Sequence, residues 1–159
     1  MRRSAVRQII DAIAVSLPVR SGKGLRLRVF RCTHIDHCTV SITNLERSRH
    51  FYGTTLGLRE VAPPREFDFV AVWYDLGGQH LHLLLKPAAE PPSVRHFCLH
   101  VDDIVAARAS LRERGLELEE TVKVAAAERF FVRDPDGNRV EILQWLRPYE
   151  PTADGSRRL

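Results

Sequence analysis

The sequence predicts an α+β domain built from two copies of one βαβββ module. The first observation is the stretch DPDGNRVEILQW at 134–145, which has the pattern of a tight turn followed by a strand. The stretch DLGGQHLHLLLK at 75–86 repeats this pattern 59 residues earlier, and His37 precedes His96 by the same 59 residues. Such an internal repeat indicates a duplicated structural unit.

Length and composition indicate an ordinary globular protein. At 159 residues the chain is sufficient for one domain with a hydrophobic core, and 44% of its residues are hydrophobic. No apolar run reaches the ~18–20 residues of a membrane span, so we expect no membrane association. The three cysteines, Cys32, Cys38 and Cys98, have no metal-type spacing and are odd in number, which favours the reducing cytoplasm.

The net charge of +4 is unevenly distributed along the chain. Residues 1–31 hold eight basic residues and a single acidic one, whereas the remainder carries a small negative charge. We therefore expect a basic, flexible N-terminal extension at 1–31, although an arginine-rich, acid-poor start is also typical of a targeting peptide. Because the basic residues belong to this extension, the charge does not indicate that the domain binds nucleic acid.

The first module is expected at 32–87. Three of its strands are predicted from alternating patterns, at Arg31–Thr43, Phe67–Tyr74 and Gln79–Lys86. An amphipathic helix is predicted at Leu45–Leu56, because Asn44 is a good N-cap and Gly57 is typical of a helix end.

The second module is expected at 94–147, within a domain that spans 32–147. It opens with a strand from Val94 to Val101, and a helix capped by Asp102 or Asp103 continues to Arg114. Strands are then predicted at Leu116–Val124, at Arg129–Arg133 and after the DPDGN turn. Residues 148–159 are expected to form a frayed C-terminal tail.

Four metal-ligating side chains occupy equivalent positions in the two modules. His37 and His96 lie on the opening strands, and His82 and Glu141 lie on the closing strands. The alternation of apolar and polar residues directs all four to the polar, concave face of the sheets. Three imidazoles and one carboxylate suit a divalent Zn, Ni, Fe, Co or Mn ion. In an octahedral site they leave two neighbouring positions, which two adjacent oxygens of one substrate can fill.

The sequence resembles the vicinal oxygen chelate superfamily, in particular its glyoxalase/bleomycin resistance/dioxygenase proteins. Four sequence blocks between Ile35 and Trp145 carry the resemblance: IDHCTVSITNLERSRHFYGTTLGL, QHLHL, RHFCLHVDD and FVRDPDGNRVEI. The resemblance implies an open eight-stranded cup around one metal ion, with His37, His82, His96 and Glu141 as ligands. It also implies that Glu141 is the catalytic base. Small members of the family, and the open sheet edges of such a cup, lead us to expect a homodimer.

Other side chains are candidates for the substrate pocket. His80 shares a strand face with His82, and His100 shares one with His96, whereas Trp73 and Arg129 lie on strands expected to wall the cup. Arg129 could hold a substrate carboxylate, and an exposed structural arginine is an equally good interpretation. His80 could compete for the metal, but its repeat partner is an arginine, so the repeat favours His82.

The leading hypothesis for function is a metal-dependent lyase or isomerase of the glyoxalase type. Its small-molecule substrate would bind the metal through adjacent oxygens, and an enolate or enediolate would form as a proton leaves carbon. The alternatives are an extradiol-type, ring-cleaving dioxygenase with Fe(II), which requires His82 to stay off the metal, and a drug- or metabolite-binding resistance protein. A thiol transferase that confers antibiotic resistance is a further possibility. The family contains all these activities, so the fold does not decide the reaction.

Overall fold

The computed structural model describes residues 30–65, 71–124 and 126–148. The chain divides into two units, 1–33 and 34–159, and the description below concerns the second. The N-terminal extension expected at 1–31 and the tail expected at 148–159 lie almost entirely outside the described residues. No helix in the described part of the chain is long and apolar enough to cross a membrane.

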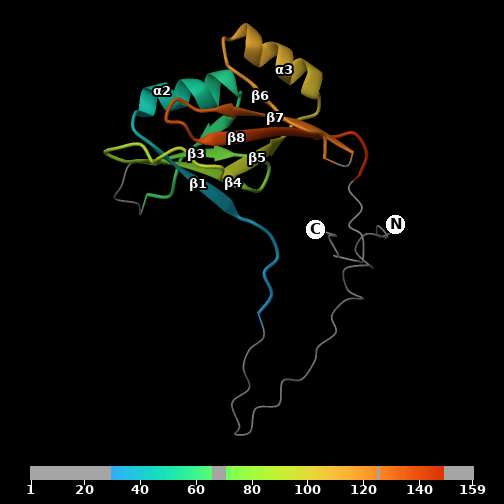
Figure 1. Ribbon diagram of the computed structural model, residues 1–159. Coiled ribbons are helices and arrows are strands. Elements are labelled where there is room, and N and C mark those ends of the chain that lie inside the picture. Colours follow the sequence, from blue (N-terminus) through green and yellow to red (C-terminus); the bar gives the residue numbers. More distant parts are fainter. Residues whose placement is uncertain (1–29, 66–70, 125, 149–159) are drawn as a thin grey trace, which may run out of the picture. The chain divides into compact units, whose positions relative to one another are not determined.

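The first module contains four strands and a helical segment (Figure 1). Its elements are β1 (His37–Ile42), α2 (Leu45–Arg49), the π-helix η1 (His50–Thr55), β2 (Arg59–Val61), β3 (Ala71–Asp75) and β4 (His80–Leu85). The strand order in the sheet is β1-β4-β3-β2. β1 runs parallel to β4, and the other pairs are antiparallel.

The second module repeats this arrangement. Its elements are β5 (His96–His100), α3 (Ile104–Glu113), β6 (Glu119–Glu120), β7 (Ala127–Arg133) and β8 (Arg139–Trp145). The strand order is β5-β8-β7-β6, with β5 parallel to β8. The predicted α+β class and the duplicated βαβββ module are therefore confirmed. The eight strands form two four-stranded sheets, and no backbone pairing between the described strands joins them.

Several element boundaries differ from the prediction. β1 begins at His37 instead of Arg31, because its partner β4 begins at His80 and the preceding residues have no strand to pair with. β6 has two residues instead of the nine expected at Leu116–Val124. β2 was not predicted, since its three residues are too few to show alternation.

The first helical segment also differs, because it is an α-helix only as far as Arg49. It continues as a π-helix, in which the amide of Leu56 donates to the carbonyl oxygen of Phe51, five residues earlier. The neighbouring residues Phe51 and Tyr52 are both buried there. The predicted end at Gly57 is confirmed by its φ of 73°.

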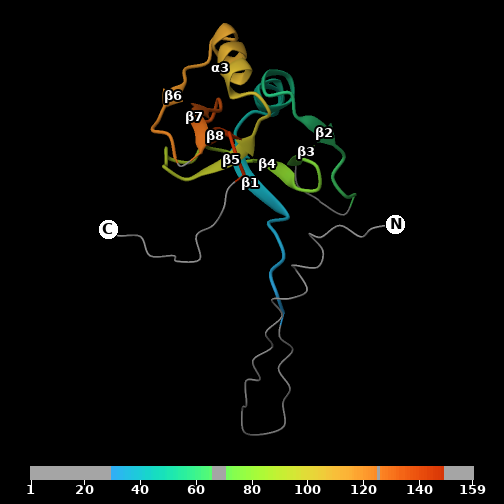
Figure 2. The ribbon, with the colours of Figure 1, turned by 90° about the vertical axis from the view of Figure 1, so that its right-hand side faces the viewer.

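One hydrophobic core is shared by both modules. It contains the inward-facing side chains of both helical segments and of the strands that they cover: Ile42, Phe51, Tyr52, Val72, Tyr74, Leu81, Leu83, Ile104, Leu111, Phe130, Val132, Val140 and Ile142. Figures 1 and 2 both show the helices on one side of the strands. The opposite faces of the two sheets are therefore left for polar residues, as the alternation predicted.

The DPDGN turn of the second module is bonded to the first module. Asp134 accepts a 2.8 Å hydrogen bond from the hydroxyl of Tyr52. Asp136 accepts a hydrogen bond of 3.1 Å from the amide of Thr43, and the side-chain amide of Asn138 donates to the carbonyl oxygen of Ser41. These bonds tie the end of β1 and the helical segment that follows it to the turn before β8. Figure 2 shows the modules side by side, with β1 and β5 near the middle.

Candidate functional site

His82 lies at the centre of an aromatic stack on the polar face of the first sheet. Its ring is 3.8 Å from that of Trp73 and 4.4 Å from that of His37, and both pairs are nearly parallel. Burial, followed by the charges of His37 and His80, lowers the pKa of His82 to about 4. The imidazole is therefore neutral at neutral pH. Its Nε2 atom is buried and has no hydrogen-bond partner among the described residues.

The ring of His37 is oriented by Asp36. The Nδ1 atom of His37 lies 2.9 Å from Oδ2 of Asp36, and this hydrogen bond lowers the pKa of the Asp36 carboxyl group. A hydrogen on Nδ1 that is donated to the carboxylate leaves the lone pair of His37 on Nε2. His37 and His82 can thus each offer an Nε2 atom to a cation.

His96 and Glu141 form a close pair on the second sheet. The Nε2 atom of His96 lies 2.9 Å from Oε2 of Glu141. The Nδ1 atom of His96 lies 3.0 Å from the carbonyl oxygen of Val94, so it carries the hydrogen for that contact. The Nε2–Oε2 contact then requires a second proton between two atoms that are both metal ligands in their deprotonated forms. A metal cation would take the place of that proton.

Glu141 is buried, with 6% of its surface exposed. Its Oε1 atom accepts a 2.9 Å hydrogen bond from Nη1 of Arg129, on the neighbouring strand β7. The ring of Phe131, the register partner of Glu141 on β7, meets the ring of His96 edge-on at 5.1 Å. Arg129 and His96 therefore hold the two oxygens of Glu141, and Phe131 packs against His96.

Cys98 lies on β5 directly opposite Glu141 in the strand register. Desolvation of its thiol by neighbouring groups, followed by the charge of Glu141, raises the pKa of the thiol to about 12, although the residue as a whole is exposed. Cys98 was not among the site residues expected from the sequence. Its position between His96 and His100, on the same strand face, was the available signal.

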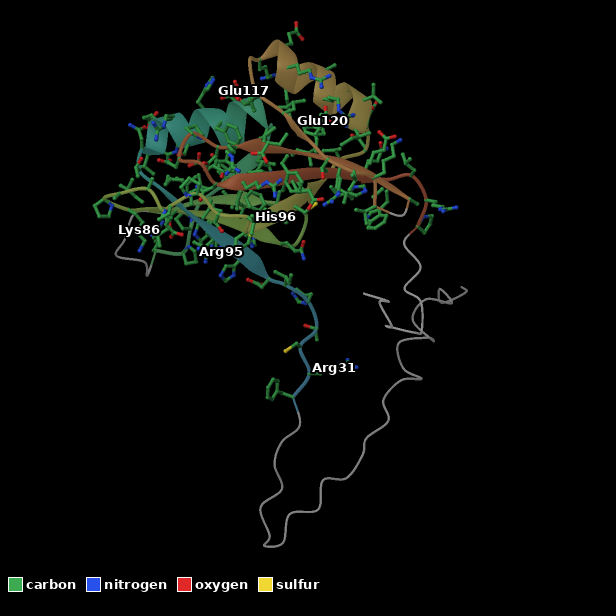
Figure 3. All side chains as sticks on the ribbon, in the orientation of Figure 1. Arg31, Lys86, Arg95, His96, Glu117 and Glu120 are labelled. Atoms are coloured by element: carbon green, nitrogen blue, oxygen red, sulfur yellow. The ribbon has the colours of Figure 1, made fainter. Side chains whose placement is uncertain are left out.

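The four expected metal ligands lie in two pairs, His37 with His82 and His96 with Glu141. Within the described ranges, no group of three or more histidine, cysteine, aspartate or glutamate side chains is placed to hold a metal ion. A cavity of about 240 Å³ is lined from both modules, by Thr39 and Ser41 of β1 and by His96 of β5. In Figure 3 the labelled His96 lies on the side of the sheet away from α3.

The other expected pocket residues lie on the same polar faces. His80 is 5.7 Å from the ring of Trp73 and 6.0 Å from that of His82. His100 is exposed at the far end of β5. Arg129 is bonded to Glu141, an interaction that the sequence did not suggest.

The donor atoms of these side chains are of the types that bind divalent metal ions, although the structure places them in two pairs. His82 has a buried nitrogen without a hydrogen-bond partner in the described part of the chain, and His37 and His96 each have Nδ1 bonded to an oxygen. This second bond is the usual means by which a metal-binding histidine is oriented. Three imidazoles with one carboxylate match the ligand preferences of Zn²⁺, Fe²⁺, Ni²⁺, Co²⁺ and Mn²⁺.

Comparison with known proteins gives consistent matches. A sequence model of the Glyoxalase/Bleomycin resistance protein/Dioxygenase superfamily matches residues 34–142. The chain is 29% identical over 115 residues to a trivalent organoarsenical cleaving enzyme of Bacillus sp. (strain MD1), a match that covers 67% of this chain and 70% of that protein. It is 27% identical over 112 residues to mitochondrial methylmalonyl-CoA epimerase of Mus musculus, which covers 62% of this chain and 63% of the epimerase.

Solved structures show the same fold. A protein from Bacillus anthracis assigned to the glyoxalase family superposes with a TM-score of 0.68 at 29% identity, covering 74% of this chain and 98% of that one. The antibiotic-binding protein TnmS3 from Streptomyces sp. CB03234 superposes with a TM-score of 0.62 at 24% identity, covering 73% and 98%. Similar folds therefore occur in proteins of different function.

Proposed function

The chain belongs to the Glyoxalase/Bleomycin resistance protein/Dioxygenase superfamily, and from this premise we propose that it is a metal-dependent lyase or isomerase. The reaction would be proton transfer at a carbon next to a carbonyl or hydroxyl group of a small substrate. The observation that carries the proposal is the 2.9 Å contact between Nε2 of His96 and Oε2 of Glu141, two atoms that both bind metals when they are deprotonated. The same family includes an epimerase among the relatives of this chain.

The proposed ligands are His37, His82, His96 and Glu141. When bound, the metal would supply a Lewis acid that holds adjacent substrate oxygens and stabilises negative charge on them. Each imidazole would contribute its Nε2 atom, which is the nitrogen left available in His37 and His96 by their Nδ1 contacts. For His82 it is the nitrogen that has no partner in the described part of the chain.

Glu141 is the proposed base. Its Oε2 atom faces His96, whereas its Oε1 atom is bonded to Arg129. The carboxylate would therefore accept and return a proton at Oε2, the oxygen that Arg129 does not occupy, when this oxygen is not bound to the metal. Burial of Glu141 keeps the carboxylate in surroundings of low polarity, which favours proton transfer to and from a bound substrate.

The first module would supply the wall against which the substrate lies. Trp73 and His80 flank His82 on the same strand face, and their rings can pack against an apolar part of the substrate.

The free state of all three cysteines supports the expectation that the protein works in the reducing cytoplasm.

The test is an anaerobic assay of the metal-loaded protein in deuterated water. The substrates would be 2-oxoaldehyde thiol adducts, 2-oxoacids, acyl thioesters and catechols. Deuterium that appears at the substrate carbon without O₂, and is lost in Glu141→Gln, is the expected result. Turnover of a catechol that strictly requires O₂ and Fe(II) would instead establish the ring-cleaving dioxygenase. Tight binding of a drug without turnover or metal would establish the binding protein.

A second candidate function is cleavage of a trivalent organoarsenical, which is the activity named for the relative from Bacillus sp.. The observation that favours it is the thiol of Cys98, which lies on the polar face opposite Glu141. Sulfur ligands prefer soft, thiophilic centres such as trivalent arsenic. Release of inorganic arsenite from a trivalent methyl- or phenylarsenical, lost in Cys98→Ser, would support this function. Unchanged cleavage in that variant would remove its structural basis.

A further inference from the structure

The carboxylate of Glu141 has a different partner on each oxygen. Oε1 accepts a 2.9 Å hydrogen bond from Nη1 of Arg129, and Oε2 lies 2.9 Å from Nε2 of His96. The partners come from β7 and β5, the two strands that flank β8. The side chain of Glu141 is almost fully buried, so neither oxygen has free access to solvent.

These two partners differ in what they can do when a metal binds. His96 can give up its proton and bind the cation through Nε2. The guanidinium of Arg129 has no available lone pair and stays protonated, so it cannot become a ligand. It can only remain bonded to Oε1, which leaves Oε2 for the metal.

Arg129 is itself held in place. Its Nε atom donates to the carbonyl oxygen of Val122 at 3.4 Å, and its Cζ atom lies 5.6 Å from the centre of the Phe131 ring. Only 20% of the side chain is exposed. A guanidinium bonded at two of its nitrogens has little freedom to turn away from Glu141.

We propose that Arg129 is a positioning residue that keeps Glu141 a one-oxygen metal ligand by occupying Oε1. This inference rests on the proposed function, because it concerns the same metal site. If the four proposed ligands held one octahedral metal ion, one oxygen from Glu141 and one nitrogen from each histidine would leave two positions free. A second oxygen from Glu141 would occupy one of them, so Arg129 preserves the space that two adjacent substrate oxygens require.

A nearby positive charge and an orienting hydrogen bond have opposite effects on metal affinity. A guanidinium close to the site repels a divalent cation, so its removal would tighten metal binding if repulsion dominated. Loss of a hydrogen bond that orients a ligand instead weakens metal binding, commonly by about 10- to 100-fold. Release of Oε1 would also let Glu141 bind through a second oxygen, so the coordination of the bound metal, and not the affinity, distinguishes a positioning residue from a nearby positive charge.

The test uses Co²⁺ as the probe, because its visible spectrum reports coordination. Arg129→Met should change the visible absorption bands of bound Co²⁺, because Oε1 of Glu141 is then free to bind the metal. Arg129→Lys keeps the charge and can donate one hydrogen bond to Oε1, so its spectrum should lie between those of the wild type and Arg129→Met. Thermal unfolding of each metal-free variant identifies any variant that does not fold. If Arg129→Met does not fold, Arg129→Lys still provides the test.

Arg139 provides the matched control. It is also 20% exposed and also lies over the ring of Phe131, at 3.5 Å, but it pairs with Glu119 instead of Glu141. Arg139→Met should leave the affinity for Co²⁺ and the spectrum unchanged. An unchanged Co²⁺ spectrum in Arg129→Met, whatever its affinity, would overturn the assignment of Arg129.

Co²⁺ binding by the wild-type protein distinguishes a failure of this inference from a failure of the proposed function. Stoichiometric Co²⁺ binding that is lost in His96→Ala supports the metal site whatever Arg129 does. A wild-type protein that binds no Co²⁺ would overturn both the metal site and the role of Arg129.

Discussion

The hydroxyl of Tyr52 donates a 2.8 Å hydrogen bond to Oδ2 of Asp134, which lies 82 residues further along the chain. Both residues are buried. The bond joins η1 of the first module to the turn that precedes β8 of the second. Burial, followed by the charge of Asp134, raises the pKa of Tyr52 far above its ordinary value, so the phenol remains a donor.

Replacement of Tyr52 by phenylalanine should destabilise the protein by about 1–3 kcal/mol, because a buried carboxylate loses one of its donors. The measurement is urea unfolding at neutral pH. Tyr74→Phe is the matched control, because Tyr74 is also fully buried and its hydroxyl has no hydrogen-bond partner among the described residues. That change should be neutral or slightly stabilising. Equal losses in the two variants would show that the Tyr52–Asp134 bond contributes nothing specific.

Replacement of His82 by alanine should sharply reduce the metal content of the purified protein, because it removes a proposed ligand. His80→Ala should leave the metal in place, although His80 lies on the same strand face and also packs against Trp73. Elemental analysis of protein purified without chelators provides the measurement. His96→Ala and Glu141→Ala should resemble His82→Ala. Full metal occupancy in all three would exclude the proposed site.

The stability of the metal-free protein should fall as the pH decreases from about 6.5 to about 4. The pKa of His82 is lowered from 6.5 to about 4 in the folded chain, whereas the unfolded chain has the ordinary value. In that interval the unfolded state binds a proton that the folded state does not, which favours unfolding. Above pH 6.5 both states are neutral at this group, so it has no effect.

The variant His82→Phe isolates this contribution. Phenylalanine keeps an aromatic ring beside Trp73 but cannot titrate. Its stability relative to the wild type, measured by urea unfolding at several pH values, should improve as the pH falls from 6.5 toward 4. A difference that does not vary with pH would contradict the lowered pKa.

The protein should form a homodimer. The outer strands β2 and β6 of the two sheets are short and have no neighbour on one side in the described structure, and open edges commonly pair or are covered in small assemblies. Light scattering at micromolar concentration should give twice the mass of the chain. A monomer at that concentration would disprove the prediction.

Removal of the first 30 residues should leave the domain intact. Residues 1–31 match neither module and differ from the rest in charge. A chain that begins at Arg31 should keep the melting temperature and the metal content of the full protein. Insolubility, or loss of a cooperative transition, would show that the N-terminal residues pack on the domain.

The sequence alone determined the duplicated module and the face on which each side chain lies. The alternation of His80, Leu81, His82 and Leu83 correctly predicted which residues enter the core, because strand side chains must alternate and only one face is covered by a helix. The turn at Gly137 was equally predictable, since its φ of 86° favours glycine.

The tertiary structure decided which of these side chains meet. The contacts of Glu141 with Arg129 and His96, and of Tyr52 with Asp134, join residues on different strands or modules. No local pattern encodes such contacts, because they depend on strand register, side-chain rotamers and the packing of one module on the other. For the same reason the repeat identified four candidate ligands, whereas the structure arranged them as two pairs, one in each module.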